Sequence, residues 1–121
     1  MSSVYIVGPM TGLPDYNKEG FDRAEVYLRS LSRYKFIINP WKLCPHEADL
    51  DTIIRLDLAA IMSVDELYVL CGHLNSVGAM AEIAIAQWRK IKIRYEDIEN
   101  PKDWSEKEIK DWLAGFRIVD E

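Results

Sequence analysis

The apolar positions of this chain fall into two alternating kinds of pattern. Short runs rich in β-branched and aromatic residues, bounded by Gly, Pro or Asn, are typical of buried strands. Longer stretches between them carry apolar residues three and four positions apart, which predicts amphipathic helices. The expected strands are residues 4–7, 36–38, 66–71 and 91–95, with 116–119 as a candidate fifth.

Helices are expected between these strands. The first follows Asn17, a plausible N-cap. Its apolar face consists of Phe21, Ala24, Leu28 and Leu31. The second covers residues from about 51 to 62, and the third covers residues 77–90. The third pattern is apolar almost all round, so we expect this helix to be well buried.

The alternation of strands and helices predicts an α/β fold. Helices between successive strands imply parallel pairing with right-handed crossovers. We therefore expect one domain over residues 1–121, a doubly wound, Rossmann-like (flavodoxin-like) parallel sheet of four to five strands flanked by helices. Ligand sites in such folds lie beyond the carboxyl ends of the strands, which brings residues 8–16 and 72–78 to the same edge.

Composition supports one globular domain and excludes several classes of protein. The chain has 121 residues, 49% of them apolar and 29% charged, which is enough for one core. No apolar run approaches the ~20 residues of a membrane span, and residues 1–4 lack the features of a signal peptide. We expect a cytoplasmic protein with no membrane partner, in which Cys44 and Cys71 are free thiols.

The net charge of -5 is confined to the end of the chain. Residues 1–95 hold 11 basic and 11 acidic side chains, whereas residues 96–121 hold 4 basic and 9 acidic ones. Without a basic excess the chain is not expected to bind extended nucleic acid, although a small anion can still bind in a local pocket. In the acidic segment, Ser105 and Glu108 form a capping box for a last helix.

Two carboxylates stand out because they lie in apolar helices. Glu82 is the one charged residue between His73 and Arg89, and it lies about one turn into a helix that begins near the expected ligand edge. Burial of such a group is costly unless the protein stabilises or uses its charge. Asp57 lies among apolar residues of the preceding helix. For both, a position on an exposed helical face is the structural alternative.

Other candidate features are less specific. The loop from Gly8 to Gly12 offers backbone donors and a hydroxyl, but it matches neither a P-loop nor the Gly-x-Gly-x-x-Gly fingerprint. Asp65 precedes a strand, where a turn role is the commoner explanation. The two Cys-x-His pairs, at residues 44–46 and 71–73, are poorly spaced for zinc, so no metal site is expected.

Three motifs follow one another along residues 4–95. They are the run from Tyr5 to Gly12, then Asp57 with Asp65, and then Asn75-Ser76-Val77-Gly78 leading to Glu82. Together they resemble the nucleoside 2-deoxyribosyltransferase superfamily, including its 2'-deoxynucleoside 5'-monophosphate N-glycosidase branch and small members found in phages and prophages. The fold of that superfamily, a parallel sheet flanked by helices, agrees with the fold predicted from the pattern.

The resemblance implies a role for each matching residue. Glu82 matches the nucleophile that attacks the anomeric carbon, Asp57 the aspartate that contacts and helps protonate the base, and Tyr5 the tyrosine beside the nucleophile. Ser76 stands where the transferases carry an aspartate for the sugar 5'-hydroxyl, and a serine there would not repel a phosphate. The implied substrate-binding residues are Gly8, Pro9, Met10, Thr11, Gly12, Asp65, Asn75, Ser76 and Gly78.

We therefore expect an enzyme, an N-glycosidase that cleaves the base–sugar bond of a (2-deoxy)nucleoside 5'-monophosphate by a retaining route. The loop at 8–16 has no basic residue, so Arg23 or Arg55 would have to supply any positive charge for the phosphate. No metal or organic cofactor is implied, and the resemblance implies a homo-oligomer. The alternatives are a nucleoside 2-deoxyribosyltransferase, a non-catalytic protein that binds or sequesters a nucleotide, and an interaction module that uses the acidic tail with Trp104 and Trp112.

Overall fold

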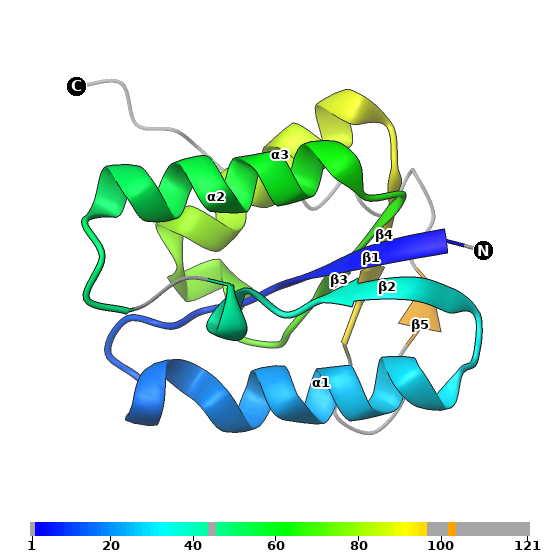
Figure 1. The fold of residues 1–121 in the computed structure, drawn as a ribbon, viewed down its shortest axis with the longest axis horizontal. Helices are drawn as coiled ribbons and strands as arrows, with labels where there is room; N and C mark the ends of the chain where they lie inside the picture. The colour runs from blue at the N-terminus through cyan, green and yellow to red at the C-terminus, as the bar shows by residue number, and fades with distance from the viewer. Residues whose placement is uncertain (1, 44–45, 97–101, 104–121) are drawn as a thin grey trace.

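A mostly parallel sheet forms the centre of the fold, in a computed structural model that describes residues 2–43, 46–96 and 102–103. Within these residues the strand order is β2-β1-β3-β4-β5 (Figure 1). The strands are β1 (Ser2–Val7), β2 (Tyr34–Ile38), β3 (Glu66–Val69), β4 (Lys92–Tyr95) and β5 (Lys102–Asp103). The first four are parallel, whereas β5 runs antiparallel to β4. This is the flavodoxin-like order, and it confirms the predicted fold class.

Two details of the strands differ from the prediction. β3 ends at Val69 and not at Cys71, because the backbone N–H of Cys71 donates to the side chain of Glu96 and not to a neighbouring strand. The strand that joins the sheet beside β4 is the two-residue β5. The candidate strand at 116–119 and the capping box at Ser105 lie outside the described residues.

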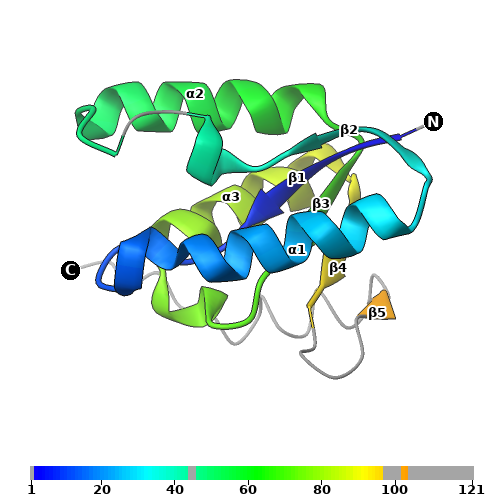
Figure 2. The same ribbon diagram turned by 60° about the horizontal axis from the view of Figure 1, so that its bottom comes forward.

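Three α-helices cover the two faces of the sheet. α1 (Lys18–Ser30) lies on one face, and α2 (Leu50–Ser63) and α3 (Val77–Arg89) lie on the other (Figure 1, Figure 2). Right-handed crossovers explain this arrangement: the chain moves from β1 to β2 in one direction and returns past β1 to β3, so α1 and α2 cover opposite faces. No helix of the described residues is long and apolar enough to cross a bilayer.

Each face of the sheet carries its own hydrophobic core, because alternate residues of β1 point to opposite faces. Val4 and Ile6 belong to the core beneath α1. The predicted apolar face of α1 is confirmed, since that core also contains Phe21, Ala24 and Leu28, with Leu31 packed against it. Tyr5 and Val7 belong to the core beneath α2 and α3. The register of β1 therefore directs Tyr5 toward these two helices.

Asn17 is the N-cap residue of α1, as predicted, but its side chain makes no capping hydrogen bond to the helix. Asp15, Tyr16 and Asn17 have φ values of 49°, 52° and 64°, so the chain enters α1 through a left-handed turn. This conformation directs the Asn17 amide back to the loop, where it donates to the backbone oxygen of Pro9 at 3.0 Å. Left-handed backbone is costly for residues other than glycine. The Trp41 indole N–H helps to hold it by donating to the backbone oxygen of Asp15 at 2.8 Å.

The prediction that the third helix is well buried holds for only one of its faces. The buried residues of α3 are Ala79, Met80, Ile83 and Ala86. On the opposite side, Val77 is 88% exposed and Trp88 is 85% exposed. The described parts of the chain that pack against α3 include β1, β4 and α2, and they leave this side open. A pattern that is apolar all round therefore gave one buried face and one exposed apolar stripe.

Candidate functional site

Tyr5 and Glu82 meet on the face of the sheet that α2 and α3 cover. The Tyr5 hydroxyl donates a hydrogen bond to Oε2 of Glu82 at 2.9 Å. Tyr5 is fully buried in β1, and Glu82 is partly buried about one turn into α3. The two residues are 77 positions apart in sequence, so only the parallel pairing of β1 and β3 brings α3 over Tyr5.

Asp57 reaches the same place from α2. It is partly buried, Tyr5 lowers its pKa, and its own charge raises the pKa of Glu82. Neither carboxylate lies on a fully exposed helical face, which was the structural alternative for both. The three residues to which the resemblance assigns catalysis therefore form one cluster, built from β1, α2 and α3.

The environment of the cluster favours the protonated form of both carboxyls. Burial, followed by the charge of Asp57, raises the pKa of Glu82 to about 8, although the hydrogen bond from Tyr5 opposes this shift. Burial raises the pKa of Asp57 to about 6, again opposed by Tyr5. Burial and the two carboxylates also raise the pKa of Tyr5, so its hydroxyl stays a donor at any physiological pH. The pair can thus hold one shared proton near neutral pH.

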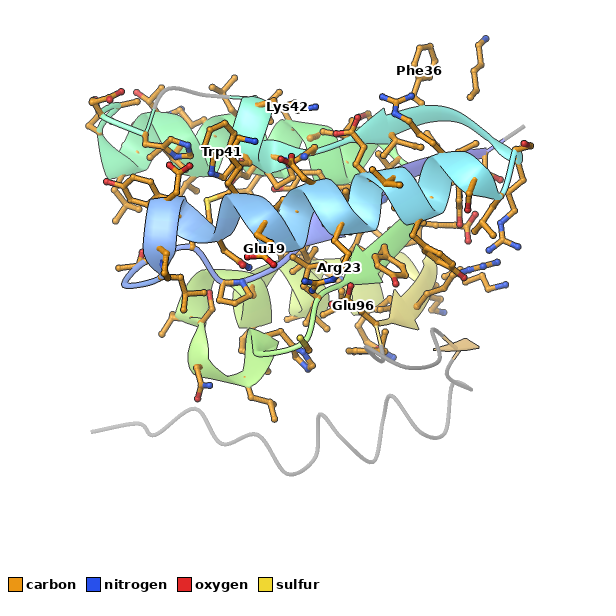
Figure 3. The ribbon with its side chains drawn as sticks, turned by 90° about the horizontal axis from the view of Figure 1, so that it is seen from below. Glu19, Arg23, Phe36, Trp41, Lys42 and Glu96 are labelled. Atoms are coloured by element: carbon orange, nitrogen blue, oxygen red, sulfur yellow. The ribbon has the colours of Figure 1, made fainter. Side chains whose placement is uncertain are left out.

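No described cation compensates this cluster. Arg23, one of the two arginines considered for a phosphate, donates from Nη2 to Oε1 of Glu96 at 2.9 Å and from Nε to Oε2 at 3.2 Å. Figure 3 shows the two side chains pointing toward one another beside α1. Arg55 donates from Nε to Asp51 at 2.7 Å on the exposed side of α2. Both arginines are already paired with carboxylates, so the expectation that one of them serves a phosphate gains no support from their placement.

The loop after β1 and the loop after β3 lie together at the carboxyl edge, as predicted. A Cβ at Gly8 would come within 2.5 Å of the Leu70 side chain, so only glycine permits this close approach. Gly72 has a φ of +85°, and a Cβ there would lie 3.5 Å from Pro9. These contacts place residues 8–12 beside the chain that leads into α3.

Within the first of these loops the predicted binding residues differ in exposure. Thr11 and Gly12 are exposed and remain accessible to a ligand. Pro9 is buried, and Met10 packs against the core beneath α1. The outer half of the loop can therefore contact a small molecule, whereas the inner half supports the fold.

Ser76 has a structural role that the sequence left unassigned. Its Oγ accepts a hydrogen bond from the backbone N–H of Ala79 at 3.2 Å, which caps the start of α3. Asn75 and Gly78 on either side are exposed, and the nearest atom to a Cβ at Gly78 would be Ser76 Oγ at 4.0 Å. The start of α3 is thus open at the carboxyl edge, where backbone N–H groups favour an anion.

Asp65 does not join the site. It precedes β3 at the amino edge of the sheet, where its Oδ2 accepts from the backbone N–H of Ser3 at 3.0 Å. The Ser3 hydroxyl donates to the same carboxylate at 3.2 Å. The resemblance placed Asp65 among the substrate-binding residues, but its position is at the amino edge of the sheet, opposite the carboxyl edge where ligands bind in such folds. Its contacts fit the turn role instead.

The cysteine and histidine pairs form no metal site within the described residues. No group of three or more His, Cys, Asp or Glu in that part of the chain is placed to hold a metal ion. Cys71 is a free, exposed thiol. Cys44, the other cysteine, lies outside the described residues.

Sequence reasoning missed an aromatic cluster beside the first loop. The rings of Tyr16 and His46 are stacked with their centroids 4.4 Å apart, and the Trp41 ring meets His46 edge-on at 4.7 Å. With the Trp41 hydrogen bond to Asp15, these contacts tie the loop after β1 to the segment that follows β2. No spacing in the sequence signals the cluster, because its members come from separate connections.

Comparison with known families adds one match. The family model described as "Domain of unknown function (DUF4406)" matches residues 2–95. That range contains the four parallel strands, the three helices and every residue of the Tyr5–Asp57–Glu82 cluster. A comparison with curated proteins found no match. Since the matched range covers most of the 121 residues, the chain belongs to the DUF4406 family, a domain of unknown function.

Proposed function

We propose that this protein is an N-glycosidase that cleaves the base–sugar bond of a (2-deoxy)nucleoside 5'-monophosphate. The observation that carries the proposal is the hydrogen bond of 2.9 Å from Tyr5 to Glu82, next to Asp57 and without a compensating cation among the described residues. The sequence motifs of the chain also resemble those of the nucleoside 2-deoxyribosyltransferase superfamily. A cluster of uncompensated carboxylates is a candidate for catalysis at a carbon centre that becomes positively charged in the transition state.

Glu82 would act as the nucleophile. Its free carboxylate oxygen forms a bond to the anomeric carbon while the bond from that carbon to the base nitrogen breaks, and the bonding electrons leave with the base. The transition state has oxocarbenium character, and the carboxylate of Glu82 stabilises its positive charge. Without substrate the site stabilises this carboxylate poorly, so the interaction is gained in the transition state. Tyr5 holds Oε2 and leaves the other oxygen, Oε1, to attack.

Asp57 would supply the proton for the leaving base. The neutral acid donates its proton to the base nitrogen, and the resulting carboxylate then takes a proton from the water that hydrolyses the glycosyl ester of Glu82. Between a pKa of about 6 and one of about 8 the pair holds one proton, which lies mainly on Glu82 in the free protein. The reaction would proceed from the form in which this proton has moved to Asp57 and Glu82 is the anion. Activity is therefore expected to follow a bell-shaped profile with its maximum between these values.

The phosphate would bind without a basic side chain from α1 or α2. Arg23 and Arg55 are engaged by Glu96 and Asp51. The open start of α3 offers backbone N–H groups and the Ser76 hydroxyl, and the helix dipole favours an anion there. These groups support a monophosphate at this position, where a carboxylate in place of Ser76 would repel it.

Product analysis tests the proposal. Wild-type protein is incubated with a panel of nucleosides and nucleoside 5'-monophosphates, and free base and sugar phosphate are measured. Release from monophosphates, abolished in Glu82→Gln and retained in Glu19→Gln on α1, supports the N-glycosidase. Base exchange that needs a second free base would favour the transferase. A raised melting temperature without turnover would favour a nucleotide-binding protein, and no response would favour the interaction module.

A further inference from the structure

Arg89, the last residue of α3, links the ends of two helices. Its Nη1 donates to the backbone oxygen of Ile61 at 2.7 Å and to that of Val64 at 2.8 Å. These carbonyls lie at the end of α2, where a helix lacks partners of its own and where its dipole favours a cation. In the described part of the chain, no other side-chain hydrogen bond joins α2 to α3.

The positions joined by Arg89 lie on the same helical sides as the two carboxylates. Glu82 precedes Arg89 by seven residues, about two turns of α3. Asp57 precedes Ile61 by four residues, about one turn of α2. The hydrogen bond from Arg89 to Ile61 therefore joins α2 and α3 along the same sides of the helices that carry Asp57 and Glu82.

We propose that Arg89 is a positioning residue that sets the separation of Asp57 and Glu82 by holding α2 against α3. In the core, α2 contacts the sheet through apolar residues such as Ala60 and Ile61. Apolar contacts are not directional, so they permit small shifts of a helix along and around its axis. The two hydrogen bonds from one guanidinium fix that position. The effect of Arg89 on catalysis rests on the proposed function, whereas its effect on the separation of Asp57 and Glu82 does not.

Two matched variants separate positioning from simpler effects. Ser63 donates from Oγ to the backbone oxygen of Ala60 at 2.8 Å, so Ser63→Ala removes a bond at the same end of α2 without touching α3. Lys90, the exposed residue after Arg89, carries the same charge and makes no contact with α2 among the hydrogen bonds of the described residues. Lys90→Gln therefore reports the loss of charge alone.

The test is the pKa of Glu82, measured by NMR with ¹³C-labelled glutamate carboxyls and assigned with Glu82→Gln. The groups that face Glu82 are Tyr5 from β1 and Asp57 from α2. Loss of a cation alone would raise the pKa of Glu82. Loss of positioning lets Asp57 move away and admits water, so Arg89→Met is expected to lower it by about half a pH unit.

The sign of the shift decides the outcome. Arg89→Lys keeps the charge and one donor group, so it should lower the pKa of Glu82 by less than Arg89→Met does. The same variant tests the proposal if Arg89→Met does not fold. Ser63→Ala and Lys90→Gln should not lower the pKa. An unchanged or raised pKa in both Arg89 variants, with a lower melting temperature, would mean that Arg89 only caps α2, and the proposal would be overturned.

Activity provides the second measurement. If the N-glycosidase proposal is right, Arg89→Met should lower kcat about 10-fold with little change in KM, because the substrate still binds but the acid and nucleophile are misplaced. A lowered pKa in a protein that cleaves no nucleotide would support the positioning role of Arg89 and count against the proposed function. The two proposals can therefore fail separately.

Discussion

Two glutamates, on opposite faces of the same sheet, show what the fold does with a partly desolvated carboxylate. Glu25 on α1 accepts hydrogen bonds from Arg29 at 2.8 Å, from Lys42 at 3.0 Å and from Asn39 at 3.1 Å. Burial opposes ionisation of Glu25, but these three donors outweigh it and lower the pKa to about 2. Glu82 accepts one hydrogen bond, from neutral Tyr5, and its pKa is raised to about 8.

Both the burial and the partners contribute to the difference, since burial is the largest cause of the raised pKa of Glu82. Both glutamates pay a desolvation cost, yet the α1 side compensates it with two cations, whereas the α2–α3 side adds a second carboxylate, Asp57. A compensated carboxylate stabilises the fold and is chemically inert. An uncompensated one has a perturbed pKa and can change its protonation state when a ligand binds, which is why Glu82 and not Glu25 is the candidate for catalysis.

The largest expected effect is on activity in Glu82→Gln. The amide keeps the size of the side chain but cannot form the glycosyl ester, so turnover should fall by about 10³-fold or more while nucleotide binding persists. Glu25→Gln should retain turnover, because Glu25 lies on the other face. Rates of base release and nucleotide binding by calorimetry check both variants. A Glu82→Gln protein that folds and keeps more than about a tenth of the wild-type rate would remove Glu82 from the mechanism.

The two glutamates should also give stability opposite dependences on pH. For Glu82, the unfolded carboxyl ionises near its ordinary value of 4.5 and the folded one near 8, so stability falls as pH rises between them, by on the order of 5 kcal/mol. For Glu25, the stabilisation is present above 4.5 and is lost as pH falls toward about 2. This loss should be on the order of 2 kcal/mol, since its cationic partners are exposed and partly screened.

Denaturant unfolding at a series of pH values measures these slopes. Glu82→Gln should flatten the decline between pH 4.5 and about 8 and leave the acid side unchanged. Glu25→Gln should lower stability near neutral pH and flatten the acid side. Identical profiles for the two variants would contradict the contrast between the faces.

Tyr5→Phe should reduce turnover by about 10- to 100-fold. Without the hydroxyl, Glu82 loses its one hydrogen bond, its pKa rises further, and Oε2 is no longer held in place. Tyr68→Phe is the matched control, because Tyr68 is also buried in a central strand but belongs to the core beneath α1. The pH–rate profiles of both variants should be measured, and equal activities would show that Tyr5 does not orient the nucleophile.

The smallest expected effect is a change of substrate preference in Ser76→Asp. Aspartate caps a helix about as well as serine, so the start of α3 should be retained. Its charge should repel a phosphate and lower the use of monophosphates relative to nucleosides by about 10-fold. The ratio of the two kcat/KM values checks this, with Ser76→Asn as the uncharged control. An unchanged ratio in Ser76→Asp would place the phosphate elsewhere.

Much of the fold and part of the candidate site can be predicted from the pattern of the sequence. Strand and helix periods, with Gly and Pro at their ends, predict the alternation of elements, and right-handed crossovers then limit the topology. The apolar helical surroundings of Glu82 and Asp57 single them out without any structure. The pattern fails where the outcome depends on neighbours, as for Asn17, whose amide bonds Pro9 and not the helix.

The local pattern of the sequence predicts the approximate extent of the four parallel strands and three helices and the buried side of α1, because these depend on local conformation and on the helical period. The tertiary structure alone decided which carboxylate is compensated. Glu25 meets Asn39 and Lys42 across 14 and 17 residues, and Glu82 meets Tyr5 across 77. Tertiary packing also places Asp65 away from the site and leaves one side of α3 exposed. Charge compensation and burial depend on distances between side chains, and segments remote in sequence acquire those distances only when they pack.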